Sequence, residues 1–136
     1  MKNAPSSVQG TPFDFRKPTR IGDTLFSKDD QIIIADGFDH CFARRTPLSQ
    51  PEPIAEAALN GLRMEVLTTE PGVQFFTANF DEPQAFPDGT VIEKHSAFCL
   101  ETQHFPDSPN RPDFPNTILR PGETFRSETI QRFTVD

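Results

Sequence analysis

One carboxylate of this sequence stands where it could act as a general base. Glu101 follows the apolar run Ala97–Leu100, and on a strand its side chain would share one face with Ala97 and Cys99. A carboxylate is costly to bury unless it is paired or used, and burial makes it hold a proton more tightly, which suits a base working near neutral pH. The alternative is a solvent-facing glutamate on a sheet with one wet face.

A second group of polar side chains lies within the five residues Asp36-Gly37-Phe38-Asp39-His40. Two carboxylates and an imidazole this close together could bind a divalent metal, but nothing elsewhere completes a known ligand pattern. A glycine-containing turn with a hydrogen-bonding aspartate is the plainer interpretation, and a carboxylate directed at a polar substrate lies between the two. We therefore expect no metal and no cofactor.

Two histidines and one glutamine complete the set of candidates. His95 and His104 flank the Glu101 segment, and either could donate a proton near the base because imidazole titrates in the useful range. Both are also expected at strand ends, where an exposed polar residue needs no special explanation. Gln74 has an amide group suited to sugar hydroxyls, although by itself it indicates no function. The sequence contains no glycine-rich phosphate loop, nucleophile elbow or paired-cysteine zinc spacing.

The elements that would position these residues are predicted to be strands. Apolar and polar residues alternate from Leu62 to Val66, directly after Asn60-Gly61, the dipeptide that best satisfies the two positive φ angles of a tight hairpin. The pattern predicts paired antiparallel strands over about Ile54–Leu59 and Leu62–Thr69. A one-turn helix is the alternative for the first of them, because it contains alanine and glutamate.

Further strands are predicted where β-branched and aromatic residues gather between turn residues. These are Ile32–Ile34, Val73–Phe80 after the turn pair Pro71-Gly72, Ser96–Gln103 and Glu128–Val135. The triple isoleucine run predicts a short strand that is buried on both faces. Five prolines keep Phe105–Pro121 in a loop or extended coil. Short strands separated by turn residues predict an all-β fold, an antiparallel β-sandwich.

Composition limits the class of protein. A chain of 136 residues is long enough for one domain with a core of its own. The formal net charge of −7, with no basic run, argues against nucleic acid or an anionic membrane as a partner. We find no apolar stretch that fits a membrane span or a leader peptide. We therefore expect a cytoplasmic protein in which Cys41 and Cys99 are reduced thiols, with a single disulfide as the alternative.

Several segments resemble, in order, landmarks of the aldose 1-epimerase (galactose mutarotase) family. The match runs from about residue 10 to the C-terminus. The landmarks are Gly10–Arg16, Gly37–His40, Met64–Val66, Pro71–Phe75, Leu100–Gln103, Phe105–Asn110, Phe114-Pro115 and Leu119–Glu123.

The resemblance implies a fold, an activity and specific site residues. Members of this family fold as a large antiparallel β-sandwich and interconvert the α and β anomers of hexoses such as galactose and glucose. By the resemblance, Glu101 is the general base that takes the proton of the anomeric hydroxyl. Asp39 then holds sugar hydroxyls, Gln74 is a further substrate contact, and His40 is structural rather than catalytic.

The resemblance also implies that part of the family's fold is missing. Members are longer, and their part that precedes this match contains the histidine that protonates the ring oxygen, a second histidine and an arginine. We therefore expect residues 1–136 to be a single partial domain, the C-terminal portion of an epimerase sandwich. A second copy or a complementing N-terminal fragment would be its partner. The alternatives are a non-catalytic carbohydrate-binding module and an inactive truncated epimerase.

Overall fold

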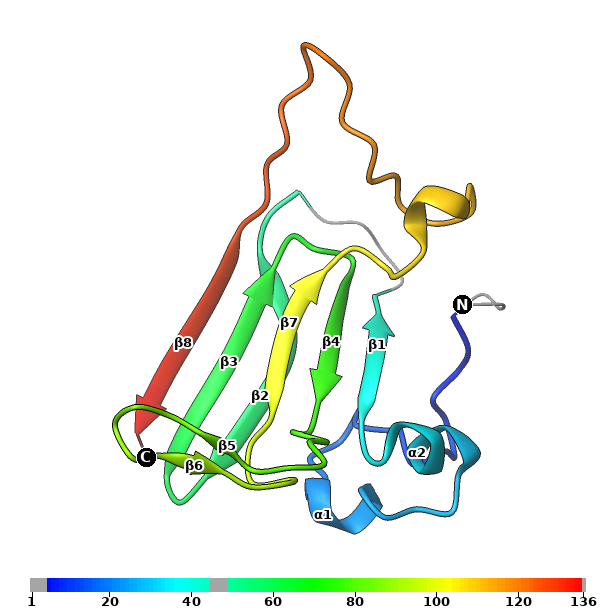
Figure 1. Ribbon diagram of the computed structural model, residues 1–136. Coiled ribbons are helices and arrows are strands. Elements are labelled where there is room, and N and C mark those ends of the chain that lie inside the picture. The colour runs from blue at the N-terminus through cyan, green and yellow to red at the C-terminus, as the bar shows by residue number, and fades with distance from the viewer. Residues whose placement is uncertain (1–4, 45–48, 136) are drawn as a thin grey trace. The chain divides into compact units, whose positions relative to one another are not determined.

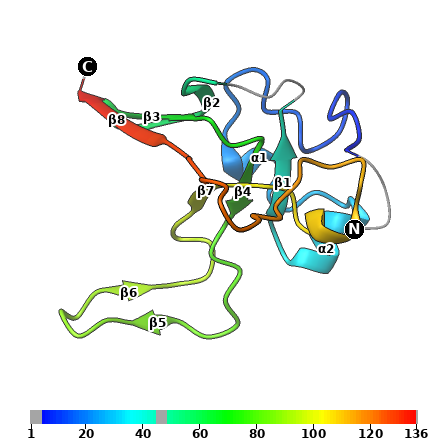
Figure 2. The same cartoon turned by 90° about the horizontal axis from the view of Figure 1, so that it is seen from above.

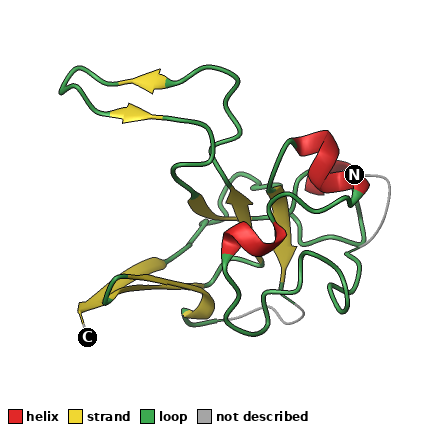
Figure 3. Ribbon diagram, turned by 90° about the horizontal axis from the view of Figure 1, so that it is seen from below, coloured by secondary structure: helices red, strands yellow, loops and turns green. Residues whose placement is uncertain are grey.

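The computed structural model describes residues 5–44 and 49–135, and in this part of the chain strands and loops greatly outnumber helices (Figure 1, Figure 3). The helical segments are α1 (Ile21–Thr24), α2 (Asp30–Ala35) and the 3₁₀ turn η1 (Ser108–Asn110). The strands are β1 (Asp39–Ala43), β2 (Glu52–Leu59), β3 (Leu62–Thr68), β4 (Gly72–Phe76), β5 (Gln84–Ala85), β6 (Val91–Ile92), β7 (Cys99–Gln103) and β8 (Thr129–Val135). Two three-stranded sheets, β1-β4-β7 and β2-β3-β8, account for most of these strands.

The chain divides into two compact units. Of the described residues, the hairpin unit contains 41–44, 49–74 and 100–135, and the phenylalanine unit contains 5–40 and 75–99. The sheet β2-β3-β8 lies within the hairpin unit, and the small β5-β6 sheet lies within the phenylalanine unit. Strands β1, β4 and β7 each pass from one unit into the other. That residues 1–136 form a single partial domain stays a prediction.

The predicted hairpin is confirmed. Strands β2 and β3 pair antiparallel around the two-residue turn, in which φ is 51° at Asn60 and 79° at Gly61. The register shifts between Pro53 and Ala55, where proline has no N–H to give to the ladder. The one-turn helix considered for Ile54–Leu59 is therefore wrong.

The third strand of this sheet comes from the far end of the chain. β8 pairs antiparallel with the free side of β3, from Leu62 opposite Val135 to Thr68 opposite Thr129, and Figure 2 shows β8 running along β3. The antiparallel pairs and the scarcity of helix among the described residues confirm the predicted all-β class. Two separate three-stranded sheets are what a sandwich-like arrangement requires.

The two faces of the β2-β3-β8 sheet differ in chemistry, because residues paired across antiparallel strands share a face. One face carries ion pairs of 2.8 Å between Arg63 and Glu56 and of 2.8 Å between Arg132 and Glu65. The opposite face, which we call the apolar face, carries Leu59, Leu62, Met64, Val66, Phe133 and Val135. Its central valine is buried, but the two β8 side chains are 57% and 82% exposed.

The phenylalanine unit has an aromatic core. Phe38 is fully buried, stacked on Phe75 with ring centroids 5.0 Å apart. Phe13 and Phe15 meet its ring edge-on at 5.7 and 5.3 Å, and Phe98 contacts Phe75 at 6.1 Å. Such edge-to-face and offset contacts are the favoured geometries of aromatic pairs.

The strand predicted for Ile32–Ile34 is wrong, because these residues lie in helix α2. The Asp29 carboxylate accepts a hydrogen bond of 2.9 Å from the backbone N–H of Gln31 and so caps the first turn. Asp36 ends the helix in the left-handed conformation, with φ of 53°. Only the first of the three isoleucines is buried, so the run was apolar without being enclosed.

The remaining expected elements are present in shorter form. β4 occupies the first part of Val73–Phe80, β7 the second part of Ser96–Gln103, and β8 nearly all of Glu128–Val135. Between Phe105 and Pro121 the described residues form no strand, and η1 is a single turn. Among the described residues, no helix is long and apolar enough to cross a membrane.

Candidate functional site

Glu101 lies in the middle of β7, and its side chain is exposed. Cys99, two residues earlier, is exposed as well, whereas Leu100 and Thr102 are half-buried. The alternation expected for a strand is therefore present from Cys99 to Thr102, with Glu101 on the solvent-facing side, whereas Gln103 is half-buried. Burial does not single out this carboxylate, so its role as a base stays a prediction.

Gln74 lies in the middle of β4, which is the hydrogen-bonded neighbour of β7. Both Gln74 and Glu101 belong to the hairpin unit, so the structure brings these two candidates onto adjacent strands. Gln74 is half-buried, and its atom Oε1 is enclosed and accepts no hydrogen bond from the described residues, although the residue has interactions of its own.

Asp39 is the first residue of β1 and its side chain is exposed. Its backbone N–H donates a hydrogen bond of 3.0 Å to Nδ1 of His40. Asp39 belongs to the phenylalanine unit, whereas Glu101 belongs to the hairpin unit. That these two carboxylates share one site stays a prediction.

The remaining candidates for a metal site are engaged in other ways. His40 packs its ring on Phe13 with centroids 4.7 Å apart, and burial lowers the pKa of this imidazole. Asp36 ends helix α2 and forms an ion pair with Lys94, which lowers the pKa of the Asp36 carboxyl. The part of the chain that the structure describes contains no group of three side chains able to hold a metal ion.

The two histidines considered as acids lie in different units. His95 is in the phenylalanine unit, where its Nδ1 donates to the backbone carbonyl of Thr77 at 3.0 Å and its ring contacts Phe26. His104 is in the hairpin unit, directly after β7, and its Nδ1 lies 2.6 Å from Oε2 of Glu70. Each imidazole therefore has one nitrogen occupied by another residue of its own unit.

Glu70 is a buried carboxylate that the sequence did not indicate. It lies between β3 and β4, with its side chain only 8% exposed, and it accepts a further short hydrogen bond from the Ser127 hydroxyl. In the sequence, Glu70 stands next to the turn pair Pro71-Gly72, a position that is typical of an exposed turn. Its partners are far away in the sequence, so no local pattern points to them.

Threonine hydroxyls extend this cluster between the strands. The hydroxyls of Thr68 and Thr129 are 2.9 Å apart, and those of Thr129 and Thr102 are 2.7 Å apart. Thr68 also accepts from the backbone N–H of Glu70 at 3.1 Å. We refer to Thr68, Glu70, Thr102, His104, Ser127 and Thr129 together as the polar network, which joins the ends of β3, β7 and β8.

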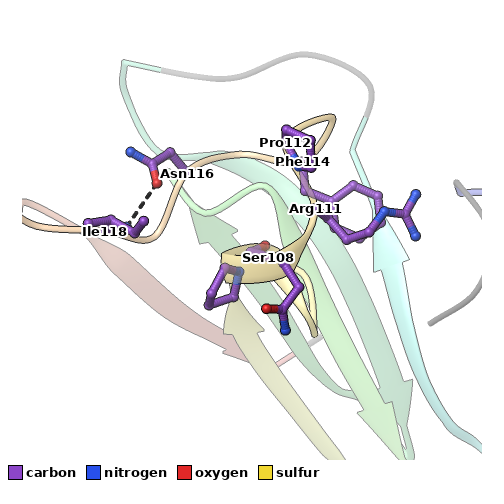
Figure 4. Close-up of a pocket in the computed structure, with 8 residues that line it drawn as sticks. Ser108, Arg111, Pro112, Phe114, Asn116 and Ile118 are labelled. Atoms are coloured by element: carbon purple, nitrogen blue, oxygen red, sulfur yellow. Dashed lines mark hydrogen bonds between the residues drawn. The ribbon is translucent and has the colours of Figure 1, made fainter.

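A separate hollow of about 340 Å³ lies in the proline-rich loop (Figure 4). The Arg111 guanidinium lies 4.3 Å from the centre of the Phe114 ring and forms an ion pair of 2.7 Å with Asp113. None of the three predicted site residues lines this hollow. Its lining residues are Ser108, Pro109, Asn110, Arg111, Pro112, Phe114, Asn116 and Ile118.

Comparison with known proteins decides the family. The sequence model of the aldose 1-epimerase family matches residues 2–132. The chain belongs to the aldose 1-epimerase family. It is 44% identical over 130 residues to human galactose mutarotase and 43% identical over 130 residues to the rat galactose mutarotase. It is also 34% identical over 134 residues to the aldose 1-epimerase of Escherichia coli.

This aldose 1-epimerase family chain is matched over nearly its whole length, but its relatives are much longer. The alignment with the human protein covers 94% of this chain and 36% of that protein. For the Escherichia coli protein the shares are 96% and 38%. The chain therefore spans little more than a third of the length of the relatives it matches.

Proposed function

We propose that this chain provides the base side of an aldose 1-epimerase site, which interconverts the α and β anomers of hexoses such as galactose and glucose. Glu101 acts as the general base, and Gln74 and Asp39 contact the sugar hydroxyls. The observation that carries the proposal is the family match over residues 2–132. The placement of Gln74 and Glu101 on adjacent strands of one unit supports it.

The chemistry asks for a proton to leave one oxygen and for another to reach a second oxygen. Glu101 takes the proton of the O1 hydroxyl, the O1–C1 bond becomes a carbonyl, and the C1–O5 bond breaks with its electron pair moving to O5. A proton then reaches O5 and rotation about C1–C2 follows. O5 loses its proton as it attacks the other face of C1, and O1 regains a proton from Glu101. General acid and general base each contribute about 10²–10⁴-fold, and we assign no residue of this chain as the acid.

Optical rotation of freshly dissolved α-D-galactose and α-D-glucose tests the proposal. The purified chain is compared with a Glu101→Gln variant and with a buffer blank. Faster mutarotation that disappears in the variant supports Glu101 as the base. A folded chain that accelerates neither sugar contradicts catalysis by this chain alone.

A non-catalytic carbohydrate-binding role is the second candidate, and the exposure of Glu101 favours it. A solvent-facing carboxylate can hydrogen-bond a sugar hydroxyl without being tuned as a base. Sugar binding measured by calorimetry would then persist in Glu101→Gln, with no turnover in either form. Loss of both binding and turnover in that variant would argue against it.

We further propose that the apolar face takes part in association, with a second copy of the chain or with a complementing part of an epimerase sandwich. Phe133 and Val135 are 57% and 82% exposed there, and β8 is the edge of its sheet in the described strand order. Exposed apolar rows on an edge strand favour pairing.

Light scattering tests this association. It should find a species larger than one chain, which the Phe133→Lys substitution dissociates. A monomer in both forms would contradict a second copy and leave the complementing part as the partner. A cytosolic location is proposed together with these partners.

A further inference from the structure

The geometry points to Glu70 and His104 as positioning residues that hold β7 so that Glu101 faces its substrate. This inference rests on the proposed function of Glu101 as the base. Neither residue touches the sugar in this scheme. They act through the strand that carries the base, and nothing in the sequence singled them out as a pair.

The alternation of side chains along β7 is the first step. Within β7, Glu101 and Gln103 lie on one face and Thr102 lies on the other, and His104 is the first residue after the strand. The Thr102 hydroxyl lies 2.7 Å from the Thr129 hydroxyl, and Nδ1 of His104 lies 2.6 Å from Oε2 of Glu70. The backbone that follows Glu101 is therefore fastened at Thr102, on the opposite face of β7, and again at His104.

The second step concerns the rigidity of Glu70 itself. One carboxylate oxygen faces His104 and the other accepts from Ser127, while the backbone N–H donates to Thr68 at 3.1 Å. The side chain is buried, where hydrogen bonds to a charged group are stronger than in water. A carboxylate engaged at both oxygens has little freedom, so it holds His104 in one orientation.

Glu70 also connects the base strand to the strand of the substrate contact. It immediately precedes Pro71-Gly72, which leads into β4 and Gln74. The chain is closely packed at this point, since a Cβ at Gly72 would lie 3.0 Å from Cys41 Sγ and 3.1 Å from the Phe105 ring. Glu70 therefore precedes the strand that carries Gln74, and its side chain contacts His104, which directly follows the strand that carries Glu101.

A purely structural role would affect stability alone, so the test needs a readout on Glu101. His104→Asn keeps a side-chain N–H near the place of Nδ1, whereas His104→Ala removes it. In the full chain labelled with ¹³C at glutamate carboxyls, the NMR signal of Glu101 should shift or broaden in His104→Ala and stay at the wild-type position in His104→Asn. Galactose mutarotation or binding should fall at least tenfold in the first variant and less than twofold in the second.

Two controls keep the inference falsifiable. Glu56→Ala breaks an exposed ion pair on the charged face of the β2-β3-β8 sheet and should leave the Glu101 signal unchanged. If His104→Ala does not fold, Thr102→Val removes one hydroxyl of the same network and should move the signal in the same sense.

An unmoved Glu101 signal in folded His104→Ala, or in Thr102→Val where His104→Ala does not fold, would overturn the positioning role. Failure of the proposed function looks different, because the wild-type chain would then neither bind nor convert galactose. The NMR comparison would still decide between the two histidine variants, since it needs no sugar.

Discussion

The two units of this chain hold their candidate site residues by different kinds of interaction. In the phenylalanine unit, the backbone at Asp39 is held by its neighbour Phe38, which is enclosed by aromatic rings. In the hairpin unit, the strand of Glu101 is held by the polar network around Glu70. Apolar packing is strong and non-directional, whereas hydrogen bonds are individually modest but fix orientation. We therefore expect the aromatic core of the phenylalanine unit to contribute most to stability. The polar network of the hairpin unit should instead determine the orientation of the strand that carries Glu101.

Truncating the aromatic core should have the largest effect. Phe38→Ala removes a fully buried ring, and we expect it to lower the free energy of unfolding by about 3–5 kcal/mol. Urea denaturation measures the loss, with Ile34→Ala on the exposed side of α2 as the matched control. Equal losses in the two variants would mean that the ring cluster is not the core of its unit.

The backbone turn beside the cluster should come next. Gly37 has φ of 130°, and an added Cβ would lie 2.8 Å from Thr77 Oγ1. Because both strain and contact oppose a side chain there, Gly37→Ala should cost about 1–3 kcal/mol. Gly89→Ala has a positive φ but no atom within 4 Å of the added carbon, so it isolates the strain. Thermal unfolding of the two variants separates the contributions.

Opening the polar network should cost less than opening the core. Glu70→Ala leaves His104 and Ser127 without their acceptor, which should lower the free energy of unfolding by about 1–3 kcal/mol. Glu56→Ala, in an exposed pair, should change it by only about 0–1 kcal/mol. Chemical denaturation of both variants checks this, and a larger loss for Glu56→Ala would reverse our ranking of the two pairs.

The smallest effect on stability is expected for the Asp14–Arg16 pair, in the loop that contains Phe13 and Phe15. Hydrogen bonds from Arg16 lower the pKa of the Asp14 carboxyl from 3.8 to about 2. The folded state therefore favours charged Asp14, and its contribution is present above pH 3.8 and lost as the pH falls towards 2. An NMR titration should show the midpoint rising in Arg16→Gln, and an unchanged midpoint would exclude the guanidinium as its cause.

The parts of the fold that were predicted correctly are those coded within a few residues. Asn60-Gly61 fixes a hairpin by its own dihedral angles, so both strands could be inferred. The run Ile32–Ile34 misled us because three apolar residues do not distinguish a strand from one exposed helical turn. Aspartate stands at both ends of the helix, as the N-cap at Asp29 and as the left-handed residue at Asp36. These two residues are visible in the sequence and favour the helix.

The site was predictable only in part, because its components depend on different ranges of sequence. Glu101, Gln74 and Asp39 followed from the family resemblance, and the structure places the first two on adjacent strands. The polar network escaped because Glu70 and Ser127 are 57 residues apart in sequence. A buried hydrogen bond between distant residues leaves no local spacing or period by which to recognise it.

The sequence separation within the β2-β3-β8 sheet has a consequence for the order of folding. β2 and β3 close over two residues, and isolated hairpins form in about 1–10 μs. The Thr68–Thr129 hydrogen bond spans 61 residues, and long closures are slower because entropy is lost before contacts form. We expect the hairpin to be protected from hydrogen exchange before β8 in pulse-labelling. The polar network would then form last. During refolding the chain should therefore become compact before Glu101 regains its native position.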